Sequence, residues 1–192
     1  MGYSLGWVAV ESGSIDAIHE RLGLSSTSTC EETPESSVVG ATLPTGWYLV
    51  VEQRGEHLLG DDLLSELSAG RQVIACFVEE HVMYSASVGW SHGRKVWSVV
   101  HDSEKAAGHL AIDGPPPTEL SAIRAALDAT QRAEDGADAK VDYVFDIPVD
   151  LAKALTGFRH DERVAGAAPS PFVVLVRRAG ATRRWWNKWR SQ

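Results

Sequence analysis

Three stretches typical of β-strands follow one another closely in the middle of the chain, over residues 73–78, 82–90 and 95–101. The first is a continuous apolar run, and the other two alternate apolar and polar side chains with the period of a β-strand. The last two flank Ser91-His92-Gly93-Arg94, a turn whose glycine tolerates positive φ. Strands with so little chain between them pair antiparallel, so the sequence predicts a central meander.

Strand-like runs that lead into helices lie on both sides of this meander. The run 5–10 precedes a helix that Ser14 opens and Gly23 stops, and the run 47–52 precedes a helix from Asp61 that ends near Gly70. The run 141–147 leads to Pro148, a residue suited to a helix start. Further predicted segments are a polar mobile loop over 25–37, a short strand over 109–112, a helix capped by Thr118 and a last strand over 172–176.

These elements favour an α+β fold over a doubly wound parallel sheet, which would need regular alternation of strands and helices. We expect a single domain over residues 1–180, with a mostly antiparallel sheet of about six to seven strands and about four helices packed mainly on one face. A basic, Trp-rich tail occupies residues 181–192.

Composition limits the cellular setting and the chemistry. The two cysteines, Cys30 and Cys76, are too few for a disulfide framework and lack metal-ligand spacing, which favours a reducing cytoplasm. The start of the chain has no basic region before Glu11, so we expect no signal peptide, and no stretch is apolar enough to span a membrane. Glycine-rich phosphate loops are absent, and the sequence predicts no cofactor and no metal.

The period of two fixes both faces of the hairpin if its turn pairs Trp90 with Lys95. A core face then holds Val82, Tyr84, Ala86, Val88 and Trp90 opposite Trp97, Val99 and His101. The other face holds His81, Met83, Ser85, Ser87 and Gly89 opposite Val96, Ser98, Val100 and Asp102.

His81, Ser85 and Asp102 on that second face are the candidate catalytic residues. A histidine that activates a hydroxyl, with a carboxylate that orients the histidine, would suit a hydrolase. No Gly-x-Ser-x-Gly motif supports this interpretation, and small polar residues are also what the solvent face of an antiparallel sheet carries. The solvent-face interpretation is the favoured one.

Two further sets of residues have alternative interpretations. Glu79 with His81, together with the dipeptides His101-Asp102 and His160-Asp161, offers zinc or manganese ligands, although neighbours on a strand point to opposite faces. Arg159 and His160 are candidate binding residues for a carboxylate or phosphate. An ion pair from Arg159 to Asp161 or Glu162 explains the arginine more simply.

Several strings give the chain a family likeness. These are Glu79-Glu80-His81-Val82-Met83, the segment from Gly89-Trp90 to His101-Asp102, and Phe145-Asp146-Ile147-Pro148 through His160-Asp161. In them the chain resembles a family of uncharacterised bacterial proteins, over roughly residues 5–162. The resemblance implies a bacterial cytoplasmic protein and transfers no catalytic residue.

Charge divides the chain unevenly. The sequence up to Glu162 holds 11 basic and 26 acidic residues, a balance of −15, whereas the rest has seven basic residues and no acid. Arg184, Trp185, Trp186 and Trp189 are therefore candidate binding residues. Docking of the tail on its own acidic domain is favoured because exposed tryptophans promote aggregation, with peripheral membrane or partner capture and single-stranded nucleic acid as alternatives.

Two classes of function are compatible with these features. The first is a non-catalytic protein-binding module, similar in style to small acidic immunity proteins, whose charge steers it to a basic protein partner and away from nucleic acid. The alternative is a hydrolase or metal-dependent enzyme that uses the His81, Ser85 and Asp102 face. The sequence favours binding.

Overall fold

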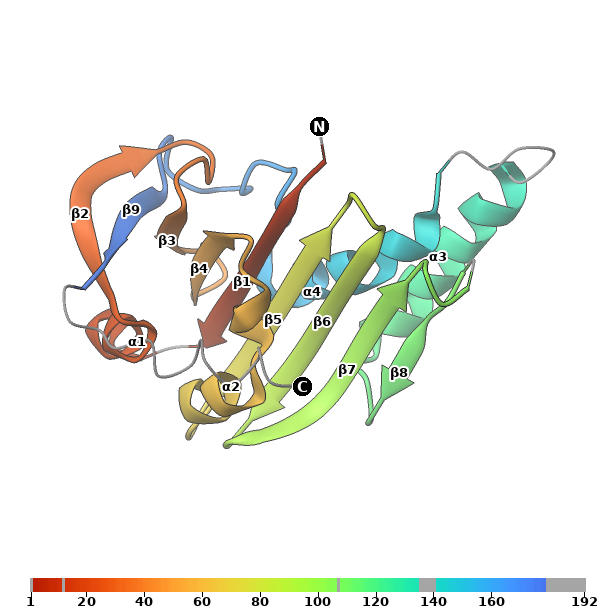
Figure 1. The fold of residues 1–192 in the computed structure, drawn as a ribbon, viewed down its shortest axis with the longest axis horizontal. Helices are drawn as coiled ribbons and strands as arrows, with labels where there is room; N and C mark the ends of the chain where they lie inside the picture. The colour runs from red at the N-terminus through yellow and green to blue at the C-terminus, as the bar shows by residue number, and fades with distance from the viewer. Residues whose placement is uncertain (1, 12, 107, 135–140, 179–192) are drawn as a thin grey trace.

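The computed structural model describes residues 2–11, 13–106, 108–134 and 141–178, which form an α+β fold on one open sheet of nine strands (Figure 1). The strand order is β2-β9-β3-β4-β1-β5-β6-β7-β8, and neighbouring strands are antiparallel throughout. The expected α+β class, antiparallel pairing and central meander are confirmed. The expected six to seven strands are too few.

The elements have the following bounds in chain order. The strands are β1 (Ser4–Glu11), β2 (Leu24–Glu31), β3 (Val38–Thr42), β4 (Trp47–Gln53), β5 (Gln72–Glu79), β6 (Tyr84–Ser91), β7 (Arg94–Asp102), β8 (Ala111–Asp113) and β9 (Phe172–Arg177). The helices are α1 (Ile15–Leu22), α2 (Asp61–Leu67), α3 (Glu119–Glu134) and α4 (Asp146–Thr156), with two 3₁₀ turns, η1 (Glu56–Leu59) and η2 (Tyr143–Phe145).

Both faces of the central strands are covered. Residues 5–10 of β1 are all buried, and β4 and β5 beside it carry similar apolar runs. One core lies between the sheet and α3 with α4, and the other lies between the sheet and α1, η1 and α2. The expectation that the helices pack mainly on one face is therefore wrong, and Figure 1 shows α2 in front of the sheet and α4 behind it.

The hairpin register follows the prediction only next to the turn. Trp90 pairs with Lys95, and His92 and Gly93 have φ of 52° and 76°, as a type I′ turn requires. Beyond the turn, Gly89 pairs with Trp97, which leaves Val96 as an extra residue in β7. This β-bulge shifts β7 by one position, so Ser85 faces His101 and Tyr84 faces Asp102.

The bulge places Trp97, Val99 and His101 opposite the small residues of β6. Ser85 and Ser87 lie completely buried on the α4 side, in one row with Gly89. Small side chains are needed here because the indole of Trp97 covers Gly89, and a Cβ at Gly89 would lie 2.2 Å from Trp97 Nε1. The prediction that Ser85 and Ser87 face solvent is therefore wrong. Most of the predicted core residues are buried as expected, but Val88 and Trp90 lie in one core and Trp97 and Val99 in the other.

Three segments differ from their predicted structure. The predicted mobile loop 25–37 contains most of β2, which lies at the sheet edge and pairs with β9. Residues 38–42 form β3, for which we predicted no element. The predicted strand over 141–147 is instead η2 and the start of α4, where Pro148 lies in the first turn and its missing N–H is tolerated.

The predicted helix ends of α1 are confirmed. Ser14 is its N-cap and accepts a hydrogen bond from Ala17 N, while Gly23 follows it in a left-handed conformation. Within the described ranges, no helix is both long and apolar enough to cross a membrane.

Replacing Gly89 with alanine tests the packing that the bulge creates. We expect Gly89→Ala to lower the free energy of unfolding by about 1–3 kcal/mol, because Trp97 must move away from the new methyl group. Ser91→Ala on the same strand is the matched control and should change it by less than about 0.5 kcal/mol. Urea denaturation followed by tryptophan fluorescence measures both, and equal effects would contradict this account.

Candidate functional site

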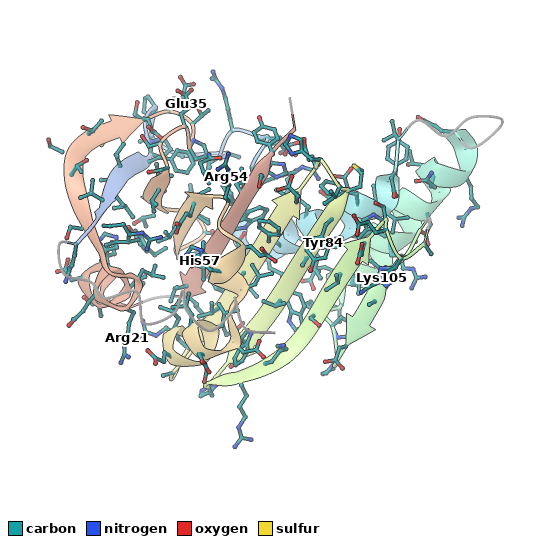
Figure 2. The ribbon with its side chains drawn as sticks, in the orientation of Figure 1. Arg21, Glu35, Arg54, His57, Tyr84 and Lys105 are labelled. Atoms are coloured by element: carbon teal, nitrogen blue, oxygen red, sulfur yellow. The ribbon has the colours of Figure 1, made fainter. Side chains whose placement is uncertain are left out.

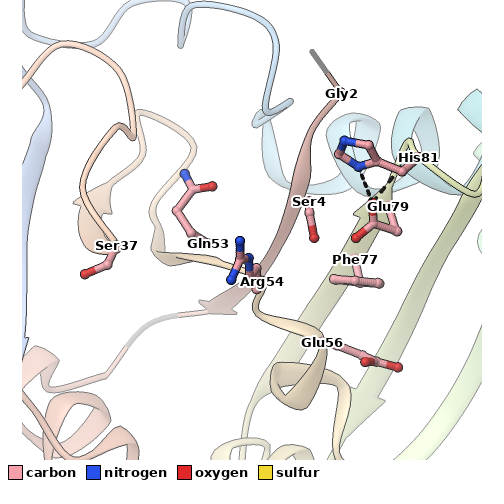
Figure 3. Close-up of a pocket in the computed structure, with 9 residues that line it drawn as sticks. All are labelled: Gly2, Ser4, Ser37, Gln53, Arg54, Glu56, Phe77, Glu79 and His81. Atoms are coloured by element: carbon pink, nitrogen blue, oxygen red, sulfur yellow. Dashed lines mark hydrogen bonds and ion pairs between the residues drawn. The ribbon is translucent and has the colours of Figure 1, made fainter.

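Two open hollows adjoin at the end of the sheet where β1 begins and β5 ends. The larger has a volume of about 1000 Å³ and is lined by Gly2, Ser4, Ser37, Gln53, Arg54, Glu56, Phe77, Glu79 and His81 (Figure 3). The smaller has a volume of about 450 Å³ and is lined by Gly2, Glu80, His81, Met83, Val141, Asp142, Phe145 and Asp146. Gly2 and His81 border both hollows, so they form one continuous region that we call the acidic end.

Arg54, Glu56 and Glu79 are charged residues that line the larger hollow. Arg54 follows β4, and Figures 2 and 3 label its side chain. It has a left-handed φ of 55° and donates its backbone N–H to Ser4 O at 2.8 Å. Glu79 ends β5, and its Oε1 lies 2.6 Å from Nδ1 of His81. A hydrogen bond from the Ser4 hydroxyl, followed by those from His81, lowers the pKa of Glu79, so this carboxylate is ionised at neutral pH.

Three carboxylates and three apolar side chains line the smaller hollow. Glu80 accepts a hydrogen bond from Tyr3 N at 2.9 Å, and Asp142 accepts one from Val144 N at 3.0 Å. Asp142 also lies 3.2 Å from Nε2 of the buried His101. The apolar lining residues are Met83, Val141 and Phe145.

Arg159 binds several carboxylates at once. Its guanidinium contacts Asp146 and Asp161 at 2.7 Å each and also Asp150, so it ties the first two turns of α4 to the loop that follows this helix. Burial raises the pKa of Asp146, although Arg159 opposes the rise. The expected ion pair with Asp161 is present, and it is one of several ion pairs through which the guanidinium connects α4 to the loop after it.

His160 is buried beneath the acidic end. Its ring lies edge-on to Tyr3, with centroids 4.9 Å apart, and neither ring nitrogen has a hydrogen-bond partner among the described residues. Nε2 is 3.6 Å from Glu80 Oε1. Burial lowers the pKa of His160, so the ring is neutral at pH 7.

The structure does not bring His81, Ser85 and Asp102 together. The Ser85 hydroxyl is buried and donates to Phe145 O at 2.6 Å, while Asp102 is on the opposite face of the hairpin, next to Lys105. His81 is exposed and pairs with Glu79. The bulge at Val96 explains the separation of Ser85 from Asp102, because it turns these two side chains to different faces.

The remaining candidates have separate outcomes. Glu79 and His81 do share a face and contact each other, but no group of three or more potential metal ligands occurs in the part of the chain that the structure describes. Arg184, Trp185, Trp186 and Trp189 lie outside the described residues.

Comparisons with protein-family models, curated proteins and solved structures find no match.

Sequence reasoning did not single out Arg54 or Asp142, and it named Glu80 and Asp146 only within the family likeness. These residues come from different segments, and only the order of strands and the position of α4 bring them to one end of the sheet. The clearest available signal was Glu79-Glu80-His81, a charged tripeptide directly after a buried apolar run.

Replacing Arg159 with methionine tests the network around α4. We expect Arg159→Met to lower the free energy of unfolding by about 3 kcal/mol, because it leaves partly buried carboxylates without their cation. Arg163→Met removes an exposed guanidinium that pairs with Glu32, and should lower it by less than about 1 kcal/mol. Urea denaturation compares the two, and a similar loss from both would show that the network adds no stability.

The buried His160 also predicts a dependence of stability on pH. The unfolded chain takes up a proton near pH 6.5, whereas the folded protein takes it up only at lower pH. The free energy of unfolding should therefore fall as the pH drops below 6.5, by up to about 1.4 kcal/mol per pH unit for this group. His160→Phe keeps an aromatic ring beside Tyr3 and should make the free energy of unfolding fall less steeply with decreasing pH. Urea denaturation from pH 7.5 to 5.5 measures this dependence, and the same dependence on pH in both proteins would refute this prediction.

Proposed function

We propose that the protein is a non-catalytic, bacterial cytoplasmic protein-binding module whose acidic end binds a basic protein partner, in the manner of small acidic immunity proteins. One observation supports this most directly. Among the described residues, the two hollows are lined by five carboxylates, Glu56, Glu79, Glu80, Asp142 and Asp146, and by one guanidinium, that of Arg54. Such a surface attracts cationic groups and repels phosphate backbones.

The local charges are only partly neutralised. Arg159 serves Asp146, but it shares its charge with Asp150 and Asp161. The charge that the described residues direct at the smaller hollow therefore remains negative, which favours a partner with clustered arginine or lysine residues over a neutral small molecule.

The alternative of a hydrolase depended on a shared face for His81, Ser85 and Asp102. Because Ser85 lies buried under α4 and Asp102 is on the other face, this alternative loses the arrangement that supported it. Binding is the function that the acidic end supports better.

A fluorescein-labelled oligo-arginine peptide tests this proposal in anisotropy titrations at low and high salt. We expect binding that weakens with salt and that weakens about tenfold in the triple variant Glu56→Gln, Glu79→Gln, Glu80→Gln. Three exposed ion pairs of about 0.5 kcal/mol each correspond to this change. The amides keep their hydrogen-bond acceptors, so folding should be preserved.

The matched control removes the same charge elsewhere, through Glu11→Gln, Glu20→Gln and Asp113→Asn, three exposed residues outside both hollows. This variant should bind the peptide within about twofold of the parent, since its acidic end is intact. Equal weakening in both variants would mean that the peptide responds only to net charge, and the proposal would then fail.

A further inference from the structure

The smaller hollow has features that suit one particular kind of side chain. Its volume of about 450 Å³ is toward the small end of the roughly 300–1,000 Å³ typical of ligand sites. Space of this size accommodates a side chain of a partner protein, whereas a whole strand or helix would not fit. The lining combines Met83, Val141 and Phe145 with three carboxylates.

The carboxylates come from three separate segments. Glu80 lies in the turn after β5, Asp142 precedes η2, and Asp146 begins α4. A group that contacts more than one of them needs several donors with a spread geometry. The guanidinium of arginine has five N–H donors in a planar fork, while an ammonium group is a compact point charge.

The apolar part of the lining fits the rest of an arginine side chain. Arginine buries its methylene stem along apolar surface while its charged end stays near polar groups, and Val141 and Phe145 offer such an apolar surface. Met83 adds an adaptable thioether side chain, which accommodates groups of irregular shape.

Three exposed hydrophobic residues line this hollow or are next in sequence to residues that line it. Among the seven large hydrophobic residues exposed in the described part of the chain, Val141 lines the hollow and is 48% exposed. Tyr3 directly follows the lining residue Gly2, and Val82 lies between the lining residues His81 and Met83, each 45% exposed. Exposed apolar groups beside charged ones are typical of a protein-interaction surface. This exposure supports a binding role separately from the acidic charge.

We propose that the smaller hollow binds a single arginine side chain of the partner, with Glu80, Asp142 and Asp146 facing its guanidinium and Met83, Val141 and Phe145 its stem. This inference rests on the proposed function and names the group through which the basic partner is recognised. Lysine meets the same charges with fewer donors and binds more weakly.

Met83 provides a direct reporter of occupancy. The chain contains two methionines, Met1 and Met83, so protein labelled with ¹³C at the methionine methyl groups gives two resonances. Met83→Leu assigns the pair. The full chain is titrated with N-acetyl-arginine methylamide and, separately, with the neutral isostere N-acetyl-citrulline methylamide.

We expect the arginine probe to shift the Met83 methyl resonance in a saturable way and the citrulline probe to leave it unchanged. Asp142→Asn should weaken the arginine probe about tenfold, a typical loss for one hydrogen bond to a charged group. Asparagine caps η2 as well as aspartate does, and Glu80→Gln gives an independent second variant. Asp113→Asn on β8, outside the hollow, should have no effect.

The outcomes separate this inference from the proposed function. Equal shifts from both probes, no shift from either, or indifference to both Asp142→Asn and Glu80→Gln would overturn the arginine site. If the oligo-arginine peptide still binds in a manner that depends on Glu56, Glu79 and Glu80, the proposed function stands and only the arginine site fails. If neither the probe nor the peptide binds, both proposals fail.

Discussion

Burial of β1 on both faces is the constraint on which the rest of this fold depends. Apolar side chains alternate from one face of the strand to the other, with Trp7 in one core and Val8 in the other. Such a strand is stable only when helices or loops cover both sides. The four helices must therefore divide between the faces, although the antiparallel sheet alone would allow one face to meet water. Gly6 fits the same constraint, since a Cβ there would lie 2.3 Å from Gly55 O.

The position of β1 also determines where the acidic end forms. Its first residues lie beside the last residues of β5, where Ser4 pairs with Glu79, and α4 begins next to them on one side of the sheet. The strands and helix that form the core begin or end here, and their terminal residues are polar because they meet solvent. The acidic end thus combines a rigid scaffold with exposed charged groups, an arrangement common in binding sites.

The sequence predicted the elements whose signals are local. The apolar run of β5, the capping residues Ser14 and Gly23 and the turn at Gly93 each act within a few residues, and each is present in the structure. The edge strand β2 was not predictable in this way. Its serines and threonines have no apolar period because most of this strand lies outside the core, and Leu24 is its one buried residue.

The expected shared face of His81, Ser85 and Asp102 is absent for a different physical reason. A single extra residue, Val96, reverses which side chains of β7 face α4, and no local feature of an alternating run identifies the bulge. This one step separated Ser85 from Asp102, whereas Ser85 is buried because it lies beside Val78 in the core on the α4 side of the sheet. The acidic end depends on contacts between segments far apart in the chain, such as Glu80 and Asp142, so its composition became visible only with the strand order.

The network around Arg159 connects stability with the proposed binding surface. The guanidinium holds the start of α4 against the loop after it, and this same helix start presents Asp146 to the smaller hollow. Because Arg159 is shared among three carboxylates, it fixes the position of Asp146 without cancelling the negative charge of the group. A carboxylate that is held in place but not fully neutralised loses little conformational entropy when a cation binds, which favours recognition of a basic partner at this end of the sheet.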